Sequence, residues 1–312
     1  MSANLLTIDQ LRRTEVEEML RLAEQPIDSL GRPLEGAGAA LIFEKPSNRT
    51  RHSMEMAVVQ LGGHPVYTPS ADVGFDIREP VEDIGRIMEG YHSMIAARVF
   101  AHSTVTRLAG SVDIPVVNML SDHAHPLQAL ADALTMRQCL GGALGDLGGM
   151  TVAYVGDYNN VARSLAEISL LLGMNVRLAC PLGFGPGEAE LERLTLLGNG
   201  AIESTARPAD AVAGANAVHT DTWVSMGQED DKAERRRLFE GFTVDDDMMS
   251  LADPSAVFMH CLPAYRGFEV TAEVIDGPRS VVFQQGHNRL HAARGALAHL
   301  CGVRPPGSEN SP

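Results

Sequence analysis

The chain of 312 residues carries 25 basic and 40 acidic side chains, which gives a net charge of −15 at neutral pH. This charge argues against a nucleic-acid or anionic-membrane surface and favours a soluble protein. The length predicts about two domains at roughly 150 residues each, and a hydrophobic content of 45% is enough for two cores. Because the net charge is negative, a binding site for an anion must be formed by a few oriented hydrogen-bond donors and not by a broad basic surface.

The cysteines and the N-terminus bear on the cellular compartment. The four cysteines are far apart and form no C-x-x-C pair, which argues against a disulfide framework or a structural zinc site. The first twenty residues mix charged and apolar side chains and lack a secretory apolar stretch, and no window reaches the roughly 18 apolar residues of a membrane span. We therefore expect a cytoplasmic protein without a metal site.

In the first half of the chain, short apolar runs alternate with helical patterns. Residues 7–25 are expected to form one capped amphipathic helix. The apolar runs predict strands and the intervening periodic segments predict helices. The expected strands are 39–43, 64–68, 94–100 and 114–120, and the expected helices include 52–61, 81–92 and 126–138.

The second half repeats this alternation after the glycine-rich segment 140–149, which is the expected domain border. The expected strands are 150–156, 175–180, 201–205, 217–221 and 256–262, and the expected helices are 160–172, 187–197, 230–240 and 244–251. Alternating strands and helices predict an α/β protein with two doubly wound parallel-sheet domains and a cleft between them. We expect one domain at 1–140, with a final helix 286–302 packing back on it, and the other at 141–285.

In open parallel sheets, ligands bind beyond the carboxyl ends of strands, so the loops that follow strands are the candidate sites. The first such loop is "EKPSNRTR". A helix that begins near Asn48 offers free N–H groups to an anion, Ser47 and Thr50 add hydroxyls, and Arg49 adds a bidentate fork. The same residues also fit an ordinary helix cap with solvated arginines.

Two more loops of the first half carry polar groups. Arg98 is expected at or near the end of its strand, where a structural salt bridge is the better interpretation for an isolated arginine and a ligand contact is the alternative. His125 and Gln128 flank Pro126 at the start of a helix, so an imidazole and an amide share one side of the first turn. The two side chains could therefore form hydrogen bonds to the same small polar group.

The loop "VGDYNN" in the second half has the strand, glycine and helix order of a nucleotide-binding turn. Only Gly156 is present where G-x-G-x-x-G needs three glycines, which weakens the dinucleotide hypothesis. Asn159 and Asn160 offer amides at a helix start, and capping alone explains one of them.

The last loops offer an acid, a hydroxyl and a thiol. Asp221, Ser225 and the backbone after Met226 suit the ammonium and carboxylate of an amino acid, although they also fit a capping loop. Cys261 ends an apolar strand, where a small buried hydrophobe is the commonest role of a free cysteine. Arg289 lies in the loop expected before the final helix.

In this order, the motifs resemble the aspartate/ornithine carbamoyltransferase superfamily, and closely its ornithine carbamoyltransferases. "FEKPSNRTR" matches S-T-R-T-R, "HPLQALADALT" matches H-P-x-Q, "DTWVSMGQE" matches D-x-x-x-S-M-G and "HCLPA" matches H-C-L-P, with "VGDYNN" and "NRLHA" also in order. The resemblance covers nearly the whole chain, and the combination of H-C-L-P with S-M-G is its specific part.

The resemblance implies a carbamoyl-phosphate domain, an ornithine domain, a homotrimer, a role in arginine biosynthesis and no cofactor. It implies catalytic roles for Arg98, His125, Cys261 and Asp221. We prefer an orienting role for the thiol, because nothing in the sequence calls for covalent catalysis. The resemblance implies that carbamoyl phosphate is held by Ser47, Asn48, Arg49, Thr50, Arg98, His125, Gln128, Cys261, Leu262 and Arg289, and ornithine by Asn160, Asp221, Ser225 and Met226.

The chain departs from the family pattern at two places. Asn48 stands where the family usually has threonine, and 73–75 reads Val-Gly-Phe where related enzymes carry a glutamine offered to a neighbouring subunit. The alternatives are a carbamoyltransferase for another amine such as putrescine or an acylated ornithine, an NAD-dependent oxidoreductase, and a non-catalytic paralogue. The free-amino-acid pattern of the Asp221 loop disfavours the first, and the missing glycines disfavour the second.

Overall fold

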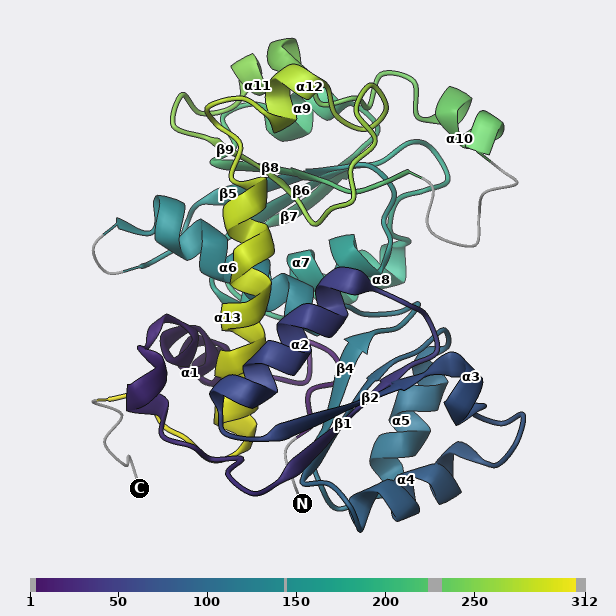
Figure 1. Cartoon of the computed structure of the whole chain (residues 1–312). Helices are drawn as coiled ribbons and strands as arrows, with labels where there is room; N and C mark the ends of the chain where they lie inside the picture. The colour runs from purple at the N-terminus through teal and green to yellow at the C-terminus, as the bar shows by residue number, and fades with distance from the viewer. Residues whose placement is uncertain (1–3, 143–144, 224–231, 307–312) are drawn as a thin grey trace. The chain divides into compact units, whose positions relative to one another are not determined.

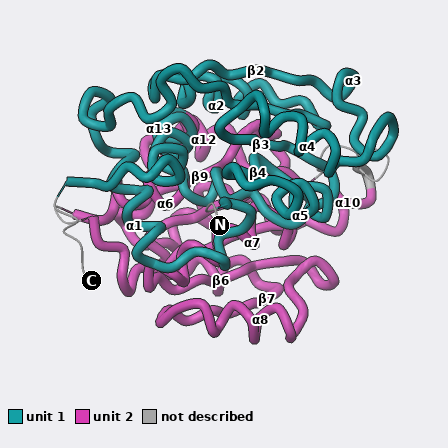
Figure 2. Tube along the Cα trace, turned by 90° about the horizontal axis from the view of Figure 1, so that it is seen from below, with its two compact units in different colours: residues 1–131, 287–312 teal, residues 132–286 magenta. Residues whose placement is uncertain are grey.

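The computed structural model describes residues 4–142, 145–223 and 232–306. The chain divides into two units, shown in Figure 2: unit 1 comprises Met1–Ala131 with His287–Pro312, and unit 2 comprises Asp132–Gly286. Helices α6 (Pro126–Leu140) and α13 (Val282–Leu300) each contain a border between the units. Among the described residues, every helix is too short or too polar to span a bilayer.

Unit 1 is built on a parallel sheet with the strand order β2-β1-β3-β4. The strands are β1 (Gly38–Phe43), β2 (His64–Pro69), β3 (Met94–Arg98) and β4 (Val116–Leu120). The order reverses between β1 and β3, because β2 is added on one side of β1 and the later strands on the other. The loops after β1 and β3 therefore meet at the switch point where such sheets bind ligands.

Helices cover both faces of this sheet (Figure 1). The longer ones are α2 (Asn48–Gln60), α4 (Val81–Glu89) and α5 (His102–Gly110), and shorter elements are η1 (Ile27–Leu30) and α3 (Ser70–Val73). Strand β3 is buried along its whole length, as expected for a parallel sheet covered on both sides. Apolar side chains of α4, α5 and the inner strands form one core cluster.

The first helix begins later than its pattern suggested. Helix α1 spans Arg13–Glu24, so the expectation of a helix from residue 7 was wrong at its start. The backbone of Leu5 instead pairs with β4, donating to Val116 O and accepting from Asn118 N at 2.9 and 2.8 Å. This pairing covers an edge of the sheet. Residues 8–11 then form a turn, with Leu11 N donating to Ile8 O at 3.0 Å, before the helix begins.

Unit 2 contains a five-stranded parallel sheet with the order β7-β6-β5-β8-β9. The strands are β5 (Thr151–Val155), β6 (Asn175–Ala179), β7 (Ile202–Thr205), β8 (Ala217–Thr220) and β9 (Val257–His260). Here the order reverses between β5 and β8. The residues that follow β5, β8 and β9 therefore emerge at neighbouring positions along one edge of the sheet.

The helices of unit 2 also lie on both sheet faces, with α7 and α8 on one and α9 and α11 on the other (Figure 1). They are α7 (Asn160–Leu171), α8 (Glu188–Thr195), α9 (Pro208–Val212), α10 (Lys232–Leu238), α11 (Asp246–Leu251) and α12 (Ala272–Ile275). Trp223, Phe239 and Phe258 belong to the core cluster of this unit. The predicted fold class, two doubly wound parallel-sheet α/β domains, is confirmed.

Candidate functional site

The loop after β1 leads into α2 through a side-chain cap. Ser47 is the N-cap, and its Oγ accepts a hydrogen bond from Thr50 N at 3.4 Å. The same hydroxyl lies 3.1 Å from Thr50 Oγ1 and donates to it. The helix thus begins at Asn48, four residues before the expected segment 52–61 and at the start that the anion-binding interpretation of the loop requires. Asn48 and Arg49 are exposed on its first turn, and Thr50 is buried.

The hydroxyl of Thr50 is a meeting point for two buried arginines. Arg98, the last residue of β3, approaches Thr50 Oγ1 with Nη1 at 3.4 Å, and Arg289 donates to the same atom from Nη2 at 3.2 Å. The exposed fractions of these arginines are only 5% and 6%. Two guanidiniums held around one small polar group form a local concentration of positive charge and donors, which suits a phosphate.

Arg289 also contacts the start of α6. Its Nη1 donates to Gln128 Oε1 and lies 3.1 Å from His125 Nε2. A guanidinium has only donors, so Nε2 of His125 accepts and the ring proton is on Nδ1. The sequence placed Arg289 in a loop before the final helix, although the expected helix 286–302 includes it. Because α13 starts at Val282, Arg289 lies inside the helix and the loop assignment was wrong.

The environment of His125 disfavours its charged form. Burial lowers the pKa of its imidazole well below the ordinary value of 6.5, and the positive charges of Arg289 and Arg98 lower it further. The ring is therefore neutral at pH 7. A neutral imidazole with its proton on Nδ1 can donate one hydrogen bond to a carbonyl oxygen without adding a third positive charge.

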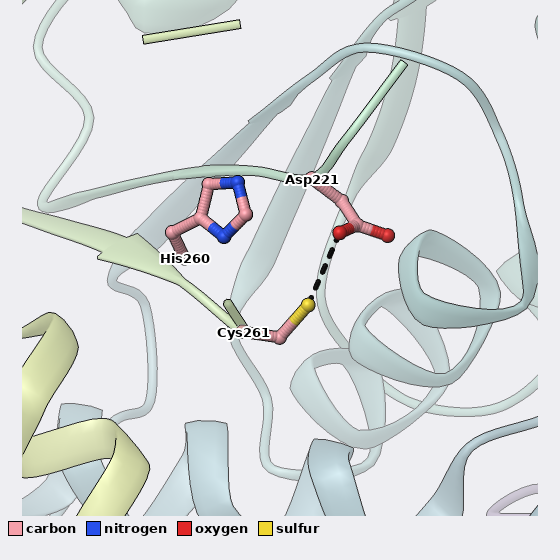
Figure 3. Close-up of side chains that lie close together, drawn as sticks. All are labelled: Asp221, His260 and Cys261. Atoms are coloured by element: carbon pink, nitrogen blue, oxygen red, sulfur yellow. Dashed lines mark hydrogen bonds between the residues drawn. The ribbon is translucent and has the colours of Figure 1, made fainter. Parts of the chain in front are cut away.

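In unit 2, an acid and a thiol meet at the ends of adjacent strands. Asp221 follows β8 and Cys261 follows β9, and Cys261 Sγ lies 3.1 Å from Asp221 Oδ1 (Figure 3). The same oxygen accepts from Thr222 N at 2.8 Å. The carboxylate is thus fixed by donors and oriented toward the thiol, which donates its proton to that bond.

Asn159 holds the other oxygen of this carboxylate. Its Nδ2 donates to Asp221 Oδ2 at 2.9 Å, while its Oδ1 caps α7 by accepting from Val161 N and Ala162 N. The sequence predicts a substrate role for Asn160 and a capping role for one of the two asparagines. The contact of the capping residue with Asp221 was not predicted, because adjacent amides at a helix start were the only local signal.

Both halves of the chain match one protein family. Residues 3–138 match the description "Aspartate/ornithine carbamoyltransferase, carbamoyl-P binding domain", and residues 148–300 match "Aspartate/ornithine carbamoyltransferase, Asp/Orn binding domain". The chain belongs to the aspartate/ornithine carbamoyltransferase family. It is 48% identical over 288 residues to an ornithine carbamoyltransferase of Thermus thermophilus, covering 92% of each chain.

Solved structures of carbamoyltransferases share the fold. The ornithine carbamoyltransferase of Pyrococcus furiosus superposes with a TM-score of 0.89 at 39% identity, covering 99% of this chain and 98% of that one. An N-acetyl-L-ornithine transcarbamylase variant gives 0.85 at 27% identity, covering 96% and 99%.

Asp221 and Cys261 also belong to a group of residues that could hold a metal ion. The donor atoms of Asp221, His260 and Cys261 lie within 4.8 Å of one another (Figure 3). However, Nδ1 of His260 accepts from Leu262 N at 2.8 Å, and Nε2 lies 3.3 Å from Glu269 Oε1. A metal would have to displace one of these partners, so the geometry favours a thiol–carboxylate pair over a metal centre.

The departure at 73–75 has a structural counterpart. Val73 and Phe75 are buried in the core cluster of unit 1 and flank Gly74, which has a left-handed backbone. Asp76 and Glu82 beyond them are both bound by Arg107. These two apolar side chains therefore contribute to packing of the core and offer no side-chain hydrogen-bond donor or acceptor. Ser225 and Met226, expected to contact ornithine, lie outside the described residues.

Proposed function

We propose that the chain is an ornithine carbamoyltransferase, which transfers the carbamoyl group of carbamoyl phosphate to the side-chain amine of L-ornithine and gives L-citrulline and phosphate. The observation that carries the proposal is the convergence of Arg98 and Arg289 on Thr50 beside His125 and Gln128. The identity to enzymes named ornithine carbamoyltransferase supports the choice of acceptor.

Carbamoyl phosphate is assigned to the residues around Thr50. The N-terminal turn of α2, with Ser47, Asn48 and Arg49, holds the phosphate together with Thr50 and the buried arginines. Gln128 and His125 address the carbamoyl group. As the tetrahedral centre forms, Arg98, Thr50 and the Nδ1–H of His125 stabilise charge on the carbonyl oxygen, at roughly 2.7–4 kcal/mol for a well-aimed donor.

The amine must lose a proton before it attacks. A lysine-like amine has a pKa of about 10.4, so only about one molecule in 10³ is neutral at pH 7. The neutral nitrogen forms a bond to the carbonyl carbon, the bond from that carbon to the phosphate oxygen breaks, and the departing phosphate accepts the proton that the nitrogen loses. The cations that bind the phosphate also favour the neutral amine.

Ornithine is assigned to unit 2. Asp221 is a fixed carboxylate that suits either the α-ammonium or the reacting amine, and Cys261 orients it through their hydrogen bond. Asn160, Ser225 and Met226 complete this part of the site by motif. Cys261 and Leu262 are also assigned to carbamoyl phosphate.

The remaining assignments follow the family. We propose that residues 1–140 with 286–302 bind carbamoyl phosphate and residues 141–285 bind ornithine. We further propose a cytoplasmic homotrimer that acts in arginine biosynthesis, with no cofactor. Gel filtration with light scattering tests the trimer directly.

A second candidate is transfer to an acylated ornithine, because a transcarbamylase for N-acetyl-L-ornithine shares the fold. Acylation converts the α-ammonium into a neutral amide, and the buried carboxylate of Asp221 suits a cation better than a neutral group. An amine panel separates the two functions: ornithine, N-acetylornithine and putrescine are each supplied with carbamoyl phosphate, and both phosphate and the carbamoylated product are measured. We expect turnover with ornithine, and turnover only with another amine would overturn the proposal.

A further inference from the structure

Three polar side chains are completely buried next to the ends of β8 and β9, the strands that lead to Asp221 and Cys261. They come from three elements of unit 2: Asp132 from α6, His219 from β8 and Gln285 from α13, and none is exposed to solvent. We call them the buried polar triad. Burial of such groups costs free energy unless each finds hydrogen-bond partners.

Gln285 is the centre of the triad. Its Oε1 accepts from the backbone N–H of His260 at 2.9 Å. Because a backbone N–H can only donate, this bond fixes which end of the amide is oxygen. The amide nitrogen of Gln285 therefore faces Asp132 Oδ1 at 2.6 Å and His219 Nε2 at 3.2 Å.

His219 is also held by its ring. The ring is stacked on Tyr154 of β5, with centroids 5.8 Å apart and an interplanar angle of 24°. Asp132 Oδ2 lies 3.6 Å from Nε2, beyond hydrogen-bond distance. Since the amide of Gln285 donates to Nε2, the ring proton is on Nδ1 in this arrangement.

The triad contacts residues near the ends of the two strands that lead to Asp221 and Cys261. His219 lies two positions before Asp221, and His260, whose N–H the triad binds, lies one position before Cys261. The strands pair in parallel with Thr220 opposite His260. Both strand ends thus contact one glutamine, and the residues that follow them place Cys261 Sγ 3.1 Å from Asp221 Oδ1.

We propose that Asp132, His219 and Gln285 are positioning residues that set the contact between Asp221 and Cys261. The kinetic part of this inference rests on the proposed function, whereas the geometric part does not. A well-packed apolar cluster could stabilise the fold equally well. Hydrogen bonds are directional, whereas apolar contacts are not. The polar triad can therefore fix both the position and the orientation of each strand end.

The test compares Gln285→Met with Gln284→Met, which makes the same change at the exposed neighbouring position of α13. Iodoacetamide labels the native protein, and peptide mass spectrometry follows Cys261 and the buried Cys180 separately. We expect Cys261 to be alkylated about tenfold faster in Gln285→Met, the change that corresponds to losing about one hydrogen bond. Cys180 and the control variant should keep the wild-type rates.

Kinetics give the second readout. In Gln285→Met the KM for ornithine should rise about tenfold, while the KM for carbamoyl phosphate stays within about twofold. A purely structural role would instead accelerate alkylation of Cys180 in parallel and leave both KM values unchanged. Wild-type rates at Cys261 together with an unchanged ornithine KM would overturn the inference.

A pair of variants at His219 covers the case in which Gln285→Met does not fold. His219→Gln keeps an acceptor for the Gln285 amide and His219→Leu removes it, so Cys261 should react several-fold faster in the leucine variant. Equal rates in the two would overturn the inference. If the wild type does not carbamoylate ornithine, the proposed function fails, and the alkylation ratios still decide whether the triad positions the pair.

Discussion

Arg289 donates a hydrogen bond from Nη2 to Thr50 Oγ1 at 3.2 Å, although the two residues are 239 positions apart in the sequence. The guanidinium is buried and also contacts His125 and Gln128. The last long helix of the chain therefore supplies a cation to the first strand-end loop. Unit 1 cannot form this cluster until its C-terminal segment is in place.

The first prediction concerns this cation. Arg289→Ala should weaken carbamoyl-phosphate binding about 100-fold, because it removes charge-assisted hydrogen bonds worth about 3 kcal/mol together. Calorimetric titration measures the change. Arg304→Ala is the matched control, because Arg304 is exposed near the end of the same segment. Equal affinity in the two variants would contradict the assignment.

The second prediction compares two arginines at the start of α2, Arg49 and Arg51, in their contribution to carbamoyl-phosphate binding. Arg49 is exposed at the second helical position, whereas Arg51 is bonded to Glu55 at 2.8 Å and lies over the ring of Tyr67. Arg49→Ala should abolish measurable carbamoyl-phosphate binding without lowering Tm by more than about 2 °C. Arg51→Ala should retain the affinity. Calorimetry and thermal melts on both variants check this difference.

The third prediction is a pH dependence of stability. Burial and the positive charges of Arg289 and Arg98 lower the pKa of His125 below 6.5. On acidification, His125 therefore binds a proton in the unfolded chain at a pH at which it stays neutral in the native protein. The stability that depends on neutral His125 is therefore complete above pH 6.5 and declines below it, by at most about 1.4 kcal/mol per pH unit. His125→Gln should show a shallower fall of Tm between pH 7 and 5, and parallel curves would contradict it.

Cys261 is expected to orient Asp221 and not to form a covalent intermediate. Cys261→Ser keeps a donor for Asp221 Oδ1 and should retain activity within about tenfold, whereas Cys261→Ala should raise the KM for ornithine further. Steady-state kinetics with both substrates measure the effect. Complete loss of turnover in the serine variant, with the fold intact, would instead indicate a nucleophilic thiol.

Glu190 gives a prediction on acid stability. Burial raises the pKa of its carboxyl, but hydrogen bonds from Arg193 and Tyr158 and the charges of Arg163 and Arg193 lower it to about 2. This contribution is present above the ordinary value of 4.5 and is lost as pH falls toward 2. Glu190→Gln should lower Tm by about 2–4 °C at pH 7, the shift for roughly 1 kcal/mol. The difference should narrow below pH 4.5, and a constant difference would refute the assignment.

The sequence predicted the elements and loops that depend on local pattern. Arg98 ends its strand and Ser47 caps α2, because strand ends and helix starts have short-range signals. The common acceptor role of Thr50 was not predictable, since nothing near residue 50 marks a partner in α13. The same holds for Gln285, whose partners come from three other elements. The helix expected from residue 7 begins only at Arg13, after a turn at residues 8–11 and a capping box between Arg12 and Glu15.

The parallel pairing of Thr220 with His260 has a consequence for protein engineering. The acid and the thiol each leave the sheet one residue after this rung, so their spacing depends on the strand ends and on the buried polar triad that contacts them, and not on the segments downstream. Inserting or deleting residues after positions 223 and 264 should therefore change which amine is accepted, while Asp221 and Cys261 keep their contact. A single deletion within either strand would instead turn one partner toward the opposite sheet face.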